Sequence, residues 1–180
     1  MSRYRVRKIF SYLLLQGTLV LTILLGLGIV NIADAAATIR QIEEAPGQVV
    51  YQSRQTLADQ HGNTWQAIAF KRIRSNGKSS LELRLVAFPG IAKIDHTKPL
   101  LLTNSLGKTL TATDVSQTIF TDPSNPELNV AQYEIQPLLP QLQAEIPLKL
   151  TIPTLDGEAI NLFLPSSFVQ DWQTLFSQIS

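Results

Sequence analysis

The sequence predicts a mainly β fold: an antiparallel β-sandwich or barrel-like domain of seven to eight strands, with two helical segments. Three observations lead to this prediction. Apolar and polar residues alternate in several short segments, most clearly at 81–87, as in strands with one buried face. Turn formers such as Asn76-Gly77 and Asp156-Gly157 separate these segments at short intervals. Apolar residues at helical spacing are confined to two stretches, near 137–145 and near 167–178.

Residues 1–35 have the pattern of a secretory signal peptide. Four basic residues precede an apolar run, and the small residues Ala33 and Ala35 follow it in the arrangement of a cleavage site. The apolar stretch 9–32 is also long enough to cross about 30 Å of hydrocarbon as a helix, so an uncleaved membrane anchor is the alternative. Under both interpretations the rest of the chain is exported.

After the signal, residues 36–47 are expected to be a polar lead-in, and residues 48–180 a single β-rich domain. The strands expected before the break at 122–126 are 49–57, 64–74, 81–90, 98–103 and 108–112. Within the third of these, Leu81, Leu83 and Leu85 share one face, and we expect them to lie in the core.

The last third of the chain follows the same pattern. The segment 130–135 alternates and is followed by the short helix near 137–145. Segments 148–152 and 160–164 form a hairpin, in which Asp156 and Glu158 are interpreted as turn residues. Ser167 and Gln170 then stand three apart, as in a capping box that begins the C-terminal amphipathic helix near 167–178.

The charge of the chain changes once the signal is set aside. The whole sequence has 15 Lys and Arg against 14 Asp and Glu, but four of these basic residues and one acidic residue precede residue 36. The remaining 11 basic and 13 acidic side chains leave the domain slightly acidic. The basic character of the precursor is therefore no reason to expect nucleic-acid binding.

One segment is nevertheless strongly basic. Residues 71–98 contain seven basic side chains and only two acidic ones, Glu82 and Asp95, which gives a net charge of plus five. The seven are Lys71, Arg72, Arg74, Lys78, Arg84, Lys93 and Lys98. Grouped around one hairpin and the following loop, they predict a positive patch that binds an acidic protein face or an anionic lipid surface. The alternative is an edge whose charges protect the sheet against aggregation.

The inventory of reactive groups is small. The chain has no cysteine, which excludes disulfides and thiolate metal sites, and its two histidines, His61 and His96, fall in a turn and in a loop. No nucleophile elbow, phosphate-binding glycine loop or dinucleotide motif occurs in the sequence. We therefore expect no nucleotide, metal or other cofactor.

Several short motifs together resemble a small family of exported cyanobacterial proteins of unknown function. They are L-R-L-V-A-F-P-G at 83–90, which ends in Phe88, Pro89 and Gly90, the pair Asp95-His96, the segment Pro99-Leu100-Leu101, Tyr133, and Leu138-Leu139. The resemblance covers about residues 45–175. It implies no activity; it implies a compartment, the thylakoid lumen or the periplasm, and a complex of the photosynthetic or envelope type.

Two functions from different classes fit these observations. The first is an exported, non-enzymatic module that binds or helps to assemble a membrane complex. The second is a small periplasmic or lumenal hydrolase centred on Asp95 and His96. A concave pocket that holds His96 with a second titratable group would favour the enzyme.

Overall fold

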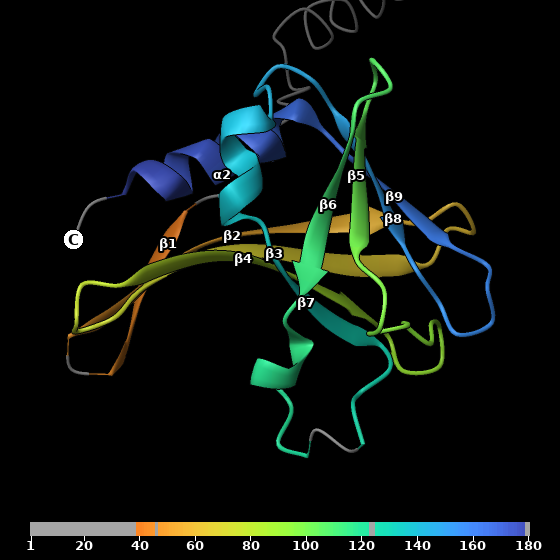
Figure 1. The fold of residues 1–180 in the computed structure, drawn as a ribbon, viewed down its shortest axis with the longest axis horizontal. Helices are drawn as coiled ribbons and strands as arrows, with labels where there is room; N and C mark the ends of the chain where they lie inside the picture. Colours follow the sequence, from red (N-terminus) through yellow and green to blue (C-terminus); the bar gives the residue numbers. More distant parts are fainter. Residues whose placement is uncertain (1–38, 46, 123–124, 179–180) are drawn as a thin grey trace, which may run out of the picture. The chain divides into compact units, whose positions relative to one another are not determined.

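A single sheet of nine antiparallel strands forms the body of the domain in the computed structural model, which describes residues 39–45, 47–122 and 125–178 (Figure 1). The signal peptide predicted at 1–35 lies outside the described residues. So does the alternative anchor at 9–32. Among the helices of the described ranges, none has the length and apolar character needed to cross a membrane.

Neighbouring strands follow the order β1-β2-β3-β4-β7-β6-β5-β8-β9. Their bounds are β1 Arg40–Ala45, β2 Gln48–Ala58, β3 Thr64–Ile73, β4 Ser79–Ala87, β5 Leu100–Asn104, β6 Thr109–Asp114, β7 Val130–Glu134, β8 Leu148–Ile152 and β9 Ile160–Leu164. The helices of the described ranges are the 3₁₀ turns η1 (Ser116–Thr118) and η2 (Gln136–Gln141), and the C-terminal α2 (Ser166–Ser177). The predicted mainly β, antiparallel fold and the C-terminal helix are confirmed. The sheet has nine strands where seven to eight are predicted, and the segment predicted as a helix near 137–145 is the shorter 3₁₀ turn η2.

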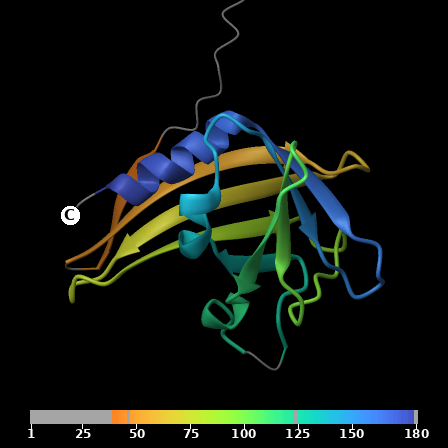
Figure 2. The same cartoon turned by 45° about the horizontal axis from the view of Figure 1, so that its top comes forward.

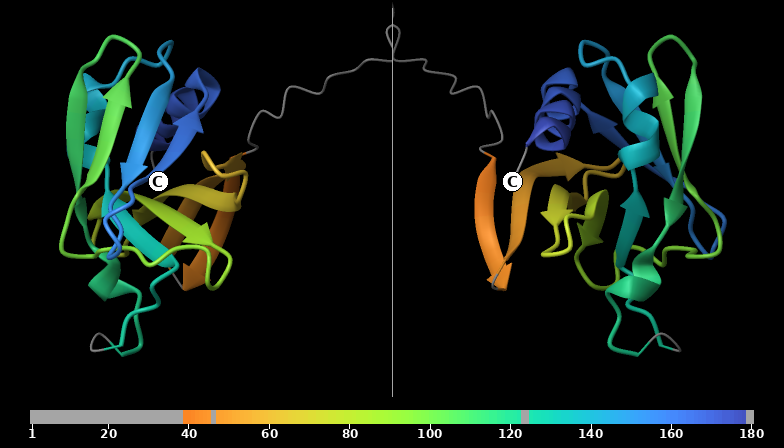
Figure 3. Two further views of the ribbon diagram at one scale, coloured as in Figure 1. Left: turned by 90° about the vertical axis from the view of Figure 1, so that its right-hand side faces the viewer. Right: turned by 60° about the vertical axis from the view of Figure 1, so that its left-hand side comes forward.

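The sheet is strongly curved, so that β5, β8 and β9 come to face β2 to β4 (Figures 2 and 3). At one end the curve nearly closes, because Asp59 at the end of β2 forms an isolated bridge with Leu162 of β9. The helix α2 packs against β2, β3 and η2 and places Phe168, Trp172 and Leu175 in the same core. The result is a partly open barrel whose opening is covered by α2.

The strand β4 lies at the centre of this core, as expected. Leu81, Leu83 and Leu85 are fully buried, whereas Glu82 and Arg84 lie on the other face and are partly exposed. Burial of one face on each of the flanking strands places the single apolar core between the sheet and α2.

Two further details differ from the sequence prediction. Residues 40–45, expected in the polar lead-in 36–47, form the edge strand β1, which pairs with β2 from Arg40 opposite Gln52 onward. The helix α2 has Pro165 as its N-cap and no side-chain cap hydrogen bond, so the predicted capping box of Ser167 and Gln170 is wrong. Since the helix begins one residue earlier than predicted, Ser167 already belongs to its first turn.

A partly buried carboxyl joins α2 to the sheet. The Ser53 hydroxyl donates to Asp171 Oδ2 at 2.9 Å, and Ser53 is fully buried. Burial raises the pKa of Asp171, and the hydrogen bond from Ser53 offsets only part of this effect. A carboxyl whose pKa is raised by folding stabilises the fold below its unfolded pKa and loses that contribution as the pH rises through the folded pKa.

We therefore expect Asp171→Asn to raise the free energy of unfolding at pH 7, because asparagine keeps the acceptor for Ser53 without the partly buried charge. The gain should disappear toward pH 4, near the ordinary pKa of an aspartate. Denaturant unfolding of both proteins at the two pH values measures it. If the difference in the free energy of unfolding between the two proteins is the same at pH 4 and pH 7, the charge of Asp171 has no part in stability.

Candidate functional site

Three loops meet at one end of the sheet and are held together by their backbones. Ala87 N–H donates to Asn129 O at 2.9 Å, Ile94 N–H to Leu128 O at 2.8 Å, and Leu155 N–H to Lys93 O at 2.8 Å. These bonds join the β4–β5 loop to the segment before β7 and to the β8–β9 loop. The end of the molecule is therefore a fixed platform built from distant parts of the chain.

This platform exposes four large apolar side chains. The exposed fractions are 67% for Phe88, 58% for Leu155, 39% for Ile91 and 36% for Leu128. We call these four residues the apolar loop end. Phe88 and Ile91 are positioned by a turn, in which Ile91 N–H donates to Phe88 O and Gly90 adopts a φ of 89°. That conformation is readily available only to glycine, which explains the Pro89-Gly90 pair.

A pocket of about 110 Å³ opens beside the apolar loop end. The β2–β3 loop, the β8–β9 loop and the start of β9 line it together with residues of the β4–β5 loop. Its lining residues are Asp59, His61, Asn63, Ile91, Ala92, Thr154, Asp156, Glu158 and Ile160. Ile91 belongs to both features, so the pocket and the apolar loop end are adjacent.

Asp59 organises the β2–β3 loop on one side of the pocket. Its Oδ1 accepts hydrogen bonds from the backbone N–H groups of His61 and Asn63, both at 2.9 Å, and its Oδ2 accepts from Asn63 Nδ2 and from Trp65 Nε1. Burial raises the pKa of Asp59, but these hydrogen bonds together outweigh burial and hold it below the ordinary value. Asp59 is therefore ionised at neutral pH.

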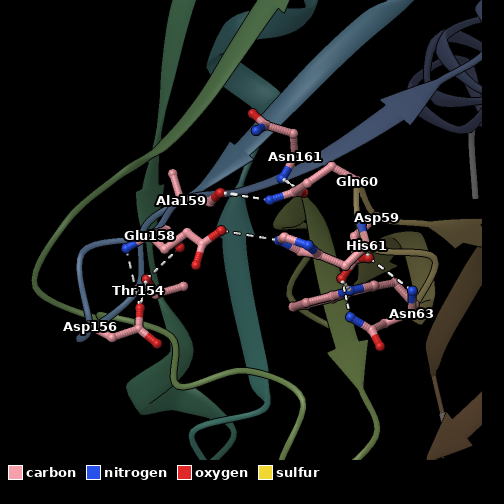
Figure 4. Close-up of polar contacts among 10 residues, drawn as sticks. Asp59, Gln60, His61, Asn63, Thr154, Asp156, Glu158, Ala159 and Asn161 are labelled. Carbon is pink, nitrogen blue, oxygen red and sulfur yellow. Dashed lines mark hydrogen bonds and ion pairs between the residues drawn. The ribbon is translucent and has the colours of Figure 1, made fainter.

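Two side chains, Gln60 and His61, hold the β2–β3 loop against the β8–β9 loop and the start of β9 (Figure 4). Gln60 donates to Ala159 O at 3.0 Å and accepts from Asn161 N–H at 2.7 Å. His61 Nε2 lies 3.2 Å from Glu158 Oε1. Gln60 thus joins segments 99 and 101 residues apart along the chain, near the bridge where the curved sheet comes closest to closing.

The β8–β9 loop supplies the other two carboxylates of the pocket. Thr154 Oγ1 donates to Asp156 Oδ1 at 2.5 Å, and the Glu158 N–H donates to the same oxygen at 3.3 Å. The Thr154 bond in particular lowers the pKa of Asp156, so this side chain is charged at neutral pH. Nowhere in the described ranges do three potential metal ligands gather into a metal site. The sequence pattern alone indicates only a turn role for Asp156 and Glu158.

Lys71, the first residue of the predicted basic patch, is not a surface residue. It is 8% exposed, and its Nζ donates to Phe176 O at 2.7 Å and to Gln178 O at 2.6 Å. Burial lowers the pKa of its amine. Lys71 therefore satisfies carbonyl groups at the C-terminus of α2, a favourable place for a cation, and its assignment to a docking patch is wrong.

The two arginines at the centre of the patch are engaged on the outer face of the sheet. The guanidinium groups of Arg72 and Arg84 each lie 5.3 Å from the Phe70 ring centroid. Arg84 also donates from Nε and Nη2 to Gln132 Oε1, and Gln132 Nε2 donates to Glu82 Oε2. These contacts cover Gln132, which is only 1% exposed.

The other four basic residues divide between two places. Arg74 and Lys78 lie at the β3–β4 turn, where Arg74 N–H bonds to Lys78 O. Lys93 and Lys98 lie in the loop that follows β4. Because β4 has nine residues and the rise is about 3.3 Å per residue, its first and last residues are about 26 Å apart. The seven residues therefore do not form one continuous patch.

Asp95 and His96 are neighbours in sequence with separate partners. Asp95 accepts from the N–H and hydroxyl of Thr97 and pairs with Lys98 at 2.9 Å; these contacts, the Thr97 hydroxyl first, lower its pKa to about 2. His96 Nδ1 lies 3.1 Å from Asp114 Oδ2, while its buried Nε2 has no partner among the described residues. Adjacent side chains diverge in this way in an extended chain. A hydrolase centred on them stays a prediction.

Comparison with known proteins adds one result. No curated protein and no solved structure matches the chain. A family model matches residues 37–175, which include every residue of the pocket and of the apolar loop end. The chain therefore belongs to the family described as "Protein of unknown function (DUF3122)".

Proposed function

We propose that this domain is an exported, non-enzymatic binding module that acts at a membrane complex. The observation that carries the proposal is the apolar loop end. Phe88 and Leu155 are more than half exposed, although the fold has a core that buries most of its large apolar residues. Grouped apolar side chains on a rigid platform are typical of a surface that is covered by a partner.

Export rests on the N-terminal pattern of basic, apolar and small residues. The choice of a membrane complex, with photosynthetic assemblies in the thylakoid lumen as one candidate, rests on the resemblance to exported cyanobacterial proteins. These two supports come from the sequence, whereas the binding surface comes from the structure.

A second contact is provided by the β3–β4 turn. Arg74 and Lys78 are exposed there, at the end of β4 opposite to Phe88. We propose that they approach an acidic protein face or anionic lipid headgroups of the same complex. Each basic residue near such a surface contributes on the order of 1 kcal/mol, and salt screens it within about 8 to 10 Å.

The test is sedimentation of the purified protein with native membranes. We expect Phe88→Ser with Leu155→Ser to weaken binding by about tenfold or more, since burying each side chain contributes on the order of 1 kcal/mol. The matched control is Phe163→Ser with Leu106→Ser, which changes residues that are 64% and 75% exposed but lie outside the platform.

A third variant, Arg74→Glu with Lys78→Glu, should weaken binding at low salt and have little effect at high salt. If the loop-end variant and its matched control bind membranes equally well, the apolar loop end is not the binding surface and the proposed function fails. Thermal unfolding of each variant controls for loss of the fold.

A further inference from the structure

We infer that the pocket beside the apolar loop end receives one cationic side chain, an arginine or a lysine, from an apolar segment of the protein partner. This inference rests on the proposed function and names the chemistry of the partner. Three features of the described site lead to it: the size of the pocket, its charge, and its position next to exposed apolar residues.

The size of the pocket limits what can enter. A volume of about 110 Å³ is well below the roughly 300 to 1,000 Å³ of pockets that enclose whole small molecules. It accommodates the end of one side chain. The wall is formed in part by Ile91, Ala92 and Ile160, which suit the methylene groups of a long side chain.

The charge of the pocket determines that the side chain that enters it is positively charged. Asp59 and Asp156 are held ionised by their hydrogen bonds, and Glu158 is the third carboxylate of the lining. His61 is the only basic residue in the lining, and it already lies against Glu158. Lys93 is close enough to Asp156 to lower its pKa but does not line the pocket. The lining therefore complements a positive charge.

The position of the pocket indicates which residues flank that side chain in the partner segment. Because Ile91 lines the pocket and also belongs to the apolar loop end, a segment that inserts a cation here lies across Phe88 and Leu155. A segment with apolar residues on both sides of one basic residue would satisfy both surfaces. Aromatic and aliphatic contacts would then supply affinity, and the carboxylates would supply specificity.

The chain contains a reporter for this event and an internal control. Its two tryptophans are Trp65, whose Nε1 donates to the pocket residue Asp59, and Trp172, which is buried on α2. The two indole N–H signals in a ¹⁵N correlation spectrum are assigned with the Trp172→Phe variant. A ligand in the pocket should shift the Trp65 signal and leave the Trp172 signal in place.

The experiment is a titration of the purified protein with two tripeptides, acetyl-Leu-Arg-Leu-amide and acetyl-Leu-citrulline-Leu-amide. Citrulline has nearly the shape of arginine without its charge. We expect the arginine peptide to shift the Trp65 signal and to bind about tenfold more tightly than the citrulline peptide. In the variant Asp156→Asn with Glu158→Gln, which keeps both side-chain shapes, this preference should fall to about twofold or less.

Three outcomes would overturn the inference: equal binding of the two peptides, shifts at Trp172 without shifts at Trp65, or an arginine preference that survives in the Asp156→Asn, Glu158→Gln variant. Each is independent of the membrane experiment. If membrane binding depends on Phe88 and Leu155 but the arginine preference is absent, this inference fails and the proposed function stands. If membrane binding ignores those two residues, the proposed function itself has failed.

Discussion

Trp172→Ala should lower the free energy of unfolding by about 3 to 5 kcal/mol, as expected for truncation of a large aromatic residue in a core. Trp172 is fully buried, and its ring packs edge-on against Phe168 with centroids 5.6 Å apart. It is the largest side chain that α2 contributes to the interior. Its loss would leave a cavity between the helix and the sheet and would release the cover of the open barrel.

Trp172→Phe provides the matched comparison. The indole Nε1 of Trp172 is buried without a hydrogen-bond partner in the described part of the chain, so phenylalanine loses volume but no hydrogen bond. In denaturant unfolding, we expect Trp172→Phe to lower the free energy of unfolding clearly less than Trp172→Ala does. If both substitutions leave the midpoint unchanged, α2 does not close the barrel in solution.

Leu83→Ala should also have a large effect and lower the free energy of unfolding by about 2 to 5 kcal/mol. Leu83 is fully buried on β4, between Ala69 of β3 and Tyr133 of β7. The adjoining strands are paired with β4, so they cannot move freely to fill the space. Denaturant unfolding should show a lower midpoint with an unchanged slope.

Leu106→Ala is the control for Leu83, because it removes the same atoms from a side chain that is 75% exposed. We expect it to change stability by less than about 0.5 kcal/mol. Equal effects of the two substitutions would mean that the inner face of β4 is assigned incorrectly.

The local pattern of apolar, polar and turn-forming residues was sufficient to predict much of this fold. Alternation identified the buried face of β4, and the hairpin of β8 and β9 was predicted with its observed bounds. Edge strand β1 gave no such signal, because Ile42 is the only large apolar residue among its six. That segment is a strand through its pairing with β2, which is a tertiary effect.

The sequence did contain a sign that Lys71 is buried, but its place in a run of basic residues led to its assignment to a surface patch. On β3, Ala67, Ala69 and Ile73 face the core, and Lys71 falls on the same side by alternation. A lysine on a buried face needs a partner for its ammonium group, and here the C-terminal carbonyls of α2 provide it. The identity of that partner depends on where a helix more than 100 residues away ends, which no local pattern contains.

The candidate site was the least predictable part for the same reason. Its lining residues come from three loops that the sequence separates, and contacts such as Gln60 to Asn161 exist only because the sheet curves until its distant parts meet. The sequence pattern indicates His61, Asp156 and Glu158 only as members of turns. Their common pocket follows from the strand order and not from any motif.

Photo-crosslinking from defined positions tests most directly whether the apolar loop end is the surface that meets a membrane complex. A photoreactive phenylalanine is placed at position 88 or, as the matched control, at position 163, where the natural residues Phe88 and Phe163 are 67% and 64% exposed. Irradiation in native membranes should give an adduct with one membrane-complex subunit from position 88 and none from position 163. Adducts of equal yield from both positions, or from position 163 alone, would mean that the apolar loop end is not the surface that meets a membrane complex.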